Sequence, residues 1–85
     1  MSKSIFTEAY ARAVARLVAL RKAKNLNQTQ LGELVGKSQH WISYIERHER
    51  RLDIIEFYVL AQALGADPLA LYAEVTDGVP RPAKF

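Results

Sequence analysis

Gln39, His40, Trp41 and Tyr44 are the residues whose chemistry stands out, because hydrogen-bonding and flat side chains gather within six positions. An ordinary solvated helix face would carry more glutamate and lysine at such positions. A glutamine amide can pair with two edge atoms of adenine in the major groove, and an aromatic ring can meet a thymine methyl group. The cluster therefore predicts a surface that contacts nucleic-acid bases.

Positive charge is concentrated around this cluster. Residues 1–51 contain ten Lys and Arg against four Asp and Glu, which gives +6, whereas residues 52–85 contain two against five, which gives −3. A basic first part favours a polyanionic partner, and an acidic remainder favours a different task for the C-terminal part.

Catalytic and metal-binding chemistry is not indicated. The chain has no cysteine, which excludes disulfides, thiolate metal sites and a cysteine nucleophile. Neither His40 nor His48 has an acidic ligand set nearby in the sequence. Asp53 and Glu56 are explained by helix capping. We therefore expect a protein that is not an enzyme and that needs neither a metal nor another cofactor.

The elements that position the cluster are predicted to be helices. Eighty-five residues allow one domain, and apolar residues recur at steps of three and four along the chain. The pattern predicts an all-α, compact five-helix domain over residues 1–76 and a flexible tail over residues 77–85. The five helices are expected at 5–24, 28–35, 39–47, 54–64 and 68–76.

The helix ends are marked by capping residues and by a glycine turn. Asn27 with Gln30, and Asp53 with Glu56, have the spacing of capping boxes. The second and third helices are joined only by residues 36–38, Gly-Lys-Ser. Two short helices joined by a tight glycine turn have the outline of a DNA-binding helix-turn-helix.

The same periodicity predicts which residues face the core. The inward residues are expected to be Leu31, Leu34, Val35, Ile42, Ile45, Ile54, Phe57, Leu60, Ala61, Leu64, Leu69 and Leu71. Tyr58, Tyr72 and Val75 fit either the core or an apolar patch for a second subunit. Trp41 lies about 100° from Ile42 around its helix and is expected to face away from the core, with a packing role as the alternative. Arg12 and Arg16 are expected on a solvated face.

The chain resembles the phage-repressor/Cro-type, XRE-like helix-turn-helix regulators. The segments that carry the resemblance are LNQTQLGELVG at 26–36, SQ at 38–39, ISYIER at 42–47 and LAQALGAD at 60–67. The resemblance covers about residues 17–72. It implies a lambda-repressor-like fold and binding to double-stranded DNA.

The resemblance also implies roles for individual residues. The base-reading positions are Gln39, His40, Trp41 and Tyr44. The phosphate-contacting positions are Gln28, Lys37, Ser43, Arg47, Arg50 and Arg51. Gln28 is further expected to brace Gln39, and Arg21 is expected to form a structural ion pair with Glu46.

The chain departs from the family pattern at Gly32, Lys37 and His48, at Leu52, where proline is common, and at Trp41, where a smaller residue is usual. Gly32 stands where alanine is usual, at a cost in helix stability of ~1 kcal/mol. Lys37 stands where an aliphatic residue is usual, so it could open the turn or reach a phosphate. His48 replaces a glycine and is expected to adopt a left-handed conformation.

Together these features predict a sequence-specific DNA-binding transcriptional regulator of repressor or controller type. It is expected to read the major groove with its third helix, as a homodimer on a palindromic operator, in the cytoplasm. No apolar run approaches the ~20 residues of a membrane span, so no membrane association is expected. One alternative is the antitoxin of a toxin–antitoxin pair, which the acidic, partly apolar C-terminal part would fit. Another is a protein-interaction module in which Trp41 and Tyr44 form a hot spot.

Overall fold

The computed structural model describes residues 5–82, with side chains described from Glu8 onward. Over this range the protein consists of helices and connections, with no strand. The helices are α1 (Ile5–Ala23), α2 (Gln28–Val35), α3 (Gln39–Glu46), α4 (Ile54–Ala63) and α5 (Pro68–Thr76). The predicted all-α fold of five helices is confirmed, and each predicted boundary lies within one residue of the observed one.

The caps explain this agreement. At α2, the Asn27 side chain accepts a hydrogen bond from the Gln30 backbone N–H while Gln30 accepts one from the Asn27 N–H. Asp53 and Glu56 form the same reciprocal box at α4. These bonds satisfy backbone donors that a helix start leaves unpaired, so they fix where each helix begins.

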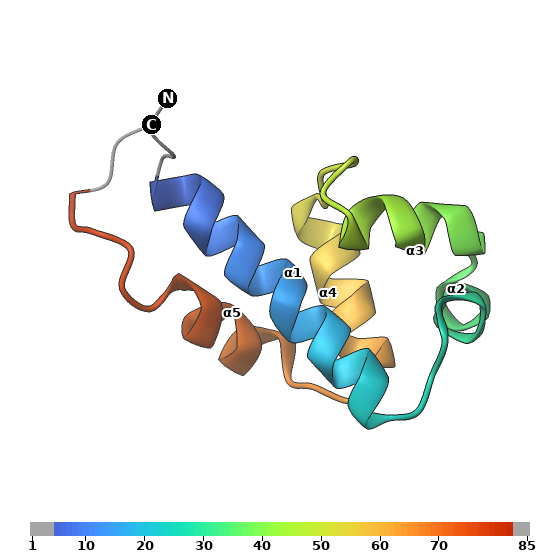
Figure 1. Ribbon diagram of the computed structural model, residues 1–85. Helices are drawn as coiled ribbons and strands as arrows, with labels where there is room; N and C mark the ends of the chain where they lie inside the picture. Colours follow the sequence, from blue (N-terminus) through green and yellow to red (C-terminus); the bar gives the residue numbers. More distant parts are fainter. Residues whose placement is uncertain (1–4, 83–85) are drawn as a thin grey trace.

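The helices are arranged around α1. Helix α5 packs on one side of α1, whereas the α2–α3 pair lies toward the other side, with α4 between the two groups (Figure 1). Helix α2 packs closely on α3 and also meets α4. The helix-turn-helix pair therefore projects at one end of the molecule and is supported from behind by α1 and α4.

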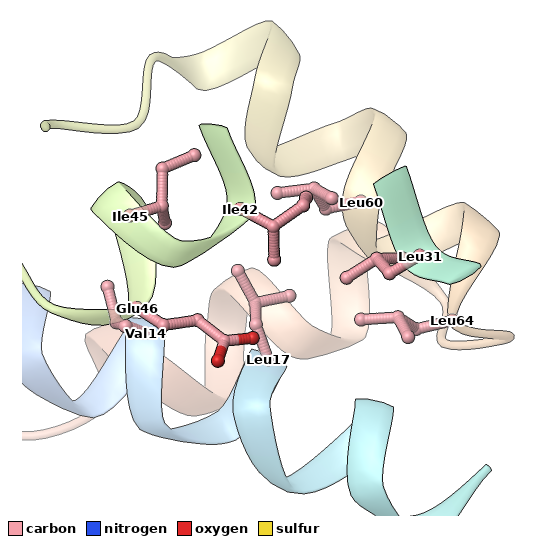
Figure 2. Close-up of a pocket in the computed structure, with 8 residues that line it drawn as sticks. All are labelled: Val14, Leu17, Leu31, Ile42, Ile45, Glu46, Leu60 and Leu64. Carbon is pink, nitrogen blue, oxygen red and sulfur yellow. The ribbon is translucent and has the colours of Figure 1, made fainter. Parts of the chain in front are cut away.

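The core joins all five helices. Its buried apolar residues are Val14, Leu17, Leu31, Ile42, Ile45, Leu60, Ala61, Leu64, Leu71 and Val75. Figure 2 shows side chains from α1, α2, α3 and α4 converging at its centre. The cavity left there is about 10 Å³, too small for more than one water molecule.

Three residues predicted to be inward are exposed instead. They are Leu34 (59%), Ile54 (73%) and Leu69 (79%). Leu34 lies about 100° away from the centre of the stripe that α2 buries. Ile54, Leu69 and Tyr72 continue apolar stripes, but no described element covers them. Of the three residues left open between the core and an apolar patch, Val75 lies in the core, whereas Tyr58 and Tyr72 are 47% and 53% exposed.

Arg12 and Arg16 do not form a simple solvated face. Arg12 donates hydrogen bonds to the backbone carbonyls of Val75 and Asp77, and Arg16 forms an ion pair with Glu74. These arginines of α1 therefore hold the C-terminal end of α5, where cations are favoured by the helix dipole. Residues 77–82 of the predicted tail contain no helix, and residues 83–85 lie outside the described part of the chain.

Candidate nucleic-acid interface

The turn between α2 and α3 depends on two glycines. Gly36 has φ +73° and closes α2 in the left-handed conformation that glycine tolerates best. Gly32 is buried in α2, and a Cβ there would lie 2.4 Å from the backbone oxygen of Lys37. The close approach of α2 to its own turn thus explains why glycine replaces the alanine expected at position 32.

Helix α3 presents an exposed row of side chains on its outward face. The rings of His40 and Tyr44 are 6.4 Å apart, and the Arg47 guanidinium lies 5.3 Å from the centre of the Tyr44 ring. All three residues are exposed and stand at positions i, i+4 and i+7, which share one helix face. The row offers aromatic and cationic groups on a single surface.

A hydrogen-bonded chain of side chains ties the start of α3 to the rest of the fold. Gln39 donates from Nε2 to Oε1 of Gln28 at 2.6 Å, and Gln28 donates from Nε2 to Oε1 of Glu46 at 2.9 Å. Glu46 in turn pairs with Arg21, with Nε–Oε2 at 2.7 Å and Nη2–Oε1 at 3.0 Å. This polar network holds Gln39 in one orientation.

The ion pair at the base of this network is mostly buried. The side chains of Arg21 and Glu46 are 11% and 15% exposed. Figure 2 shows the Glu46 carboxylate reaching from α3 toward α1, beside Val14 and Leu17. The structure thus contains the expected pair. It also links this pair to Gln28, a connection that the sequence did not predict.

Gln39 keeps bonding capacity for a partner. A glutamine amide has two N–H donors and an oxygen that can accept, and the Gln28 bond uses one donor. One N–H and the carbonyl oxygen are the donor and acceptor that bidentate pairing with adenine requires. The geometry at Gln39 is therefore compatible with a braced base contact.

Trp41 differs from its expected orientation. Its side chain is half-buried and packs against the core, next to a groove that Val35, Ile55 and Val59 also line. The expectation that it faces away from the core is wrong, and the alternative of a packing role holds for the half-buried part of the ring. Part of the indole remains exposed, with Lys37 Nζ 5.2 Å from the ring centre.

Arg50 is held by an acidic partner. Its guanidinium binds Glu56 through Nη1–Oε1 at 2.9 Å and Nη2–Oε2 at 3.0 Å. The hydrogen bond from Arg50, followed by that from the Asp53 backbone N–H, lowers the pKa of Glu56, and the same bond to Glu56 raises the pKa of Arg50. Arg50 lies in the loop between α3 and α4, but its guanidinium is held in place by Glu56.

The loop after α3 is fastened to α1 by Tyr10. The Tyr10 hydroxyl accepts a hydrogen bond from the Leu52 N–H at 2.9 Å and donates one to the Arg50 carbonyl at 3.4 Å. The Arg51 guanidinium lies 4.7 Å from the centre of the Tyr10 ring. His48 has φ +62°, as expected for a residue in the place of a glycine.

Other kinds of site are not apparent over residues 5–82. No group of three or more His, Cys, Asp or Glu side chains in that range could hold a metal ion. Within the same range, no single helix is both long and apolar enough to cross a membrane. Helices α4 and α5 meet that test only as a pair bent by 118°.

A model of a known family, described as Helix-turn-helix, matches residues 17–71 of the chain. This match spans all of α2, α3 and α4, the C-terminal part of α1 and the first turn of α5. The chain belongs to the XRE-like helix-turn-helix family. It is therefore a DNA-binding transcriptional regulator, and its family is not one of enzymes.

Individual relatives agree with this assignment. The regulator is 39% identical over 61 residues to an HTH-type transcriptional regulator, y4dJ, of Sinorhizobium fredii, a match that covers 72% of this chain and 78% of the relative.

Among solved structures, it is similar to an XRE-family like protein from Pseudomonas syringae pv. tomato. The TM-score is 0.83 at 33% identity, over 89% of this chain and 93% of that one. It is also similar to the restriction-modification controller protein C.AhdI from Aeromonas hydrophila, with a TM-score of 0.65 at 32% identity, over 73% and 90% of the two chains.

The sequence did not predict that Tyr10 and Glu56 of this helix-turn-helix regulator belong to the candidate interface. Tyr10 lies about forty positions from the loop that it fastens, and in the sequence it fits the apolar stripe of α1. Glu56 has the spacing of a capping residue and fills that role, which conceals its second bond to Arg50. The only available signal for Glu56 was the opposite charge of an arginine six residues earlier.

Proposed function

We propose that this regulator binds a palindromic operator as a homodimer and reads each half-site with α3 in the major groove. The observation that carries the proposal is the network from Arg21 through Glu46 and Gln28 to Gln39. It fixes the first residue of an exposed helix in an orientation that leaves a donor and an acceptor available. Preorganised polar groups of this kind are suited to base-edge recognition.

The proposed base-reading surface follows from the exposed side of α3. Gln39 starts the helix, and His40 and Tyr44 continue the outward row. The exposed part of Trp41 borders this row and supplies an apolar contact at the edge of the groove. Residues at the N-terminal part of a recognition helix approach base edges most closely in helix-turn-helix complexes.

The proposed phosphate contacts surround that surface. They are made by Gln28, Lys37, Ser43, Arg47, Arg50 and Arg51, which come from α2, the turn, α3 and the loop that Tyr10 fastens. Arg51 has no carboxylate partner within the ion-pair distance among residues 5–82, so its charge is available to a phosphate. Such contacts set the register of the helix on DNA without reading sequence.

The proposed dimer contact lies on α4 and α5. Ile54, Tyr58, Leu69 and Tyr72 are exposed and line one groove of about 330 Å³ between these helices. A second copy of this chain is the occupant we assign, because one recognition helix contacts too few base pairs for high specificity. A two-fold symmetric protein then requires a palindromic site. With DNA as its partner, the protein is expected in the cytoplasm.

A salt series on variants tests the assignment of roles. We expect Gln39→Ala and Tyr44→Ala each to cost about 1–3 kcal/mol on the selected duplex and to relax preference at one position of each half-site. Arg51→Ala should weaken binding to selected and scrambled duplexes alike and reduce the salt slope by about 0.9 per subunit. Equilibrium binding at several salt concentrations measures both quantities.

Matched controls come from exposed side chains that are not among the proposed DNA contacts. Gln62→Ala removes an exposed glutamine of α4, and Arg81→Ala removes an exposed arginine beyond α5. Both should bind as the unchanged protein does. A change of preferred sequence in Arg51→Ala but not in Gln39→Ala or Tyr44→Ala would mean that the recognition surface is misassigned.

A further inference from the structure

Glu56 accepts more bonds than a helix cap requires. Its Oε1 accepts the Asp53 backbone N–H at 2.9 Å, which completes the capping box of α4. Both of its carboxylate oxygens also accept from Arg50, at 2.9 and 3.0 Å. Its side chain is 18% exposed, against 40% for that of Arg50. The more buried carboxylate thus holds the more exposed guanidinium.

The bonded pair lies beside the proposed DNA surface. The Arg50 guanidinium is 5.0 Å from the centre of the Trp41 ring, and Lys37 Nζ is 5.2 Å from the same centre. Trp41 belongs to α3, and Lys37 belongs to the turn that precedes it. Two cations of the candidate phosphate-contacting set therefore share one aromatic ring, and Glu56 neutralises one of them.

We propose that Glu56 competes with DNA phosphates for Arg50 and thereby weakens the salt-dependent part of the DNA affinity. The proposal rests on the proposed function, because it assumes that the face containing α3 meets the DNA backbone. A phosphate, like a carboxylate, can accept two parallel hydrogen bonds from a guanidinium. A phosphate that binds Arg50 must therefore replace Glu56 or leave the guanidinium shared.

The capping box strengthens this competition. The Asp53 N–H holds the Glu56 carboxylate in place whether or not Arg50 is bound, so the competing anion is already positioned. Arg50 consequently contributes less than one full charge to phosphate binding. Because phosphate binding is independent of sequence, Glu56 lowers the affinity for every duplex by the same factor.

Glu56→Gln tests the proposal without removing the cap. Glutamine serves at the same capping position in α2, where Gln30 completes the box with Asn27. We expect Glu56→Gln to steepen the dependence of log K on log salt by up to about 0.9 per subunit. Affinity at low salt should rise equally for selected and scrambled duplexes. The gain should disappear in the double variant Glu56→Gln/Arg50→Gln.

A second comparison, between two arginine variants, leaves Glu56 unchanged. Arg50→Gln alone should reduce the salt slope by less than Arg51→Gln does. Of these two arginines, only Arg50 is paired with a carboxylate, that of Glu56. The control is Glu74→Gln, which removes the carboxylate that pairs with Arg16 on the side of α1 away from α3. It should leave the slope nearly unchanged, which separates a local competition from a change of net charge.

The outcomes separate this proposal from the proposed function. Absence of DNA binding by the unchanged protein would overturn both. If the unchanged protein binds DNA, the competition is contradicted by an unaltered slope in a folded Glu56→Gln variant, or by a gain that persists after Arg50→Gln. It is equally contradicted if Arg50→Gln flattens the slope as much as Arg51→Gln. Circular dichroism at each condition verifies that every variant is folded.

Discussion

Glu46 shows how single residues couple the fold to the proposed recognition surface. Its carboxylate accepts from Arg21 of α1 and from Gln28 of α2, and Gln28 accepts from Gln39 of α3. The buried side-chain nitrogens and oxygens of the described residues all have hydrogen-bond partners. Satisfied polar networks of this type favour one arrangement, since any alternative leaves a buried group unpaired.

The ion pair at the base of the network should be costly to break from one side. We expect Arg21→Met or Glu46→Leu alone to lower the free energy of unfolding by about 3 kcal/mol, because each leaves one mostly buried charge without its partner. The double variant should lose less than either single variant. Chemical denaturation measures all three differences.

The exposed pair Arg16–Glu74 provides the control for this cycle. Its side chains are 41% and 53% exposed, so Arg16→Met and Glu74→Leu should each change stability by less than about 1 kcal/mol. Equal costs for the two pairs would show that the Arg21–Glu46 pair does not anchor the network.

Gln28 and Gln39 should act as one unit in DNA binding. Because Gln28 orients Gln39 through a 2.6 Å hydrogen bond, either alanine variant should lose specific affinity, and the double variant should lose less than the sum. Binding free energies on the selected duplex give the coupling. Strict additivity would indicate that the bond between the two side chains does not operate in the complex.

At the scale of elements, the turn after α2 determines how α3 is presented. The Lys37 N–H and the Gly36 N–H both donate to the Gly32 carbonyl, which draws the turn back onto α2. Gly32 has no room for a side chain, whereas Gly36 needs only a left-handed backbone. The two glycines therefore serve the same turn for different physical reasons.

Alanine substitutions should distinguish these reasons. Gly36→Ala meets no atom within 4 Å, so we expect a loss of about 1–2 kcal/mol from backbone strain alone. Gly32→Ala gains helix propensity but forces the Lys37 carbonyl away. It should lose about 1–3 kcal/mol and also weaken specific DNA binding through displacement of α3. Thermal unfolding and duplex binding provide the two readouts.

A Gly32→Ala variant with unchanged stability and affinity would show that the turn can relax without cost. Thr29→Ala, on the exposed side of the same helix, is the control and should change stability by less than about 0.5 kcal/mol.

Elements were more predictable from the sequence than the contacts between them. The caps at Asn27 and Asp53 depend on residues three positions apart, so local spacing was enough to place the helix starts. Trp41 packs against the core and lines a groove with Ile55 and Val59 of α4, which periodicity within α3 does not reveal. The bond between Arg50 and Glu56 was missed because loop geometry decides whether the two side chains meet.

At the scale of the whole molecule, the two ends of the fold have different surfaces. The end formed by α2 and α3 presents polar, aromatic and cationic side chains. The groove between α4 and α5 presents exposed apolar side chains. Residues 52–80 contain no lysine or arginine, which suits protein contact better than DNA contact.

Leu69→Asp should therefore prevent dimer formation without unfolding the domain. Leu69 is 79% exposed, so a charge there is solvated in the single chain but buried against a second copy. Light scattering should give twice the mass of one chain for the unchanged protein and the mass of one chain for the variant. The control is Leu34→Asp, at a leucine of α2 that is 59% exposed, and this variant should stay dimeric. A dimeric Leu69→Asp variant would place the contact elsewhere.

Selection of bound sequences from random duplex DNA by the purified, unchanged protein tests the central claim most directly. A homodimer that reads each half-site with α3 should enrich a palindromic consensus, with its two halves separated by about one helical turn or a multiple of it. Enrichment of no sequence, or of a single unrepeated half-site bound by one chain, would contradict the account.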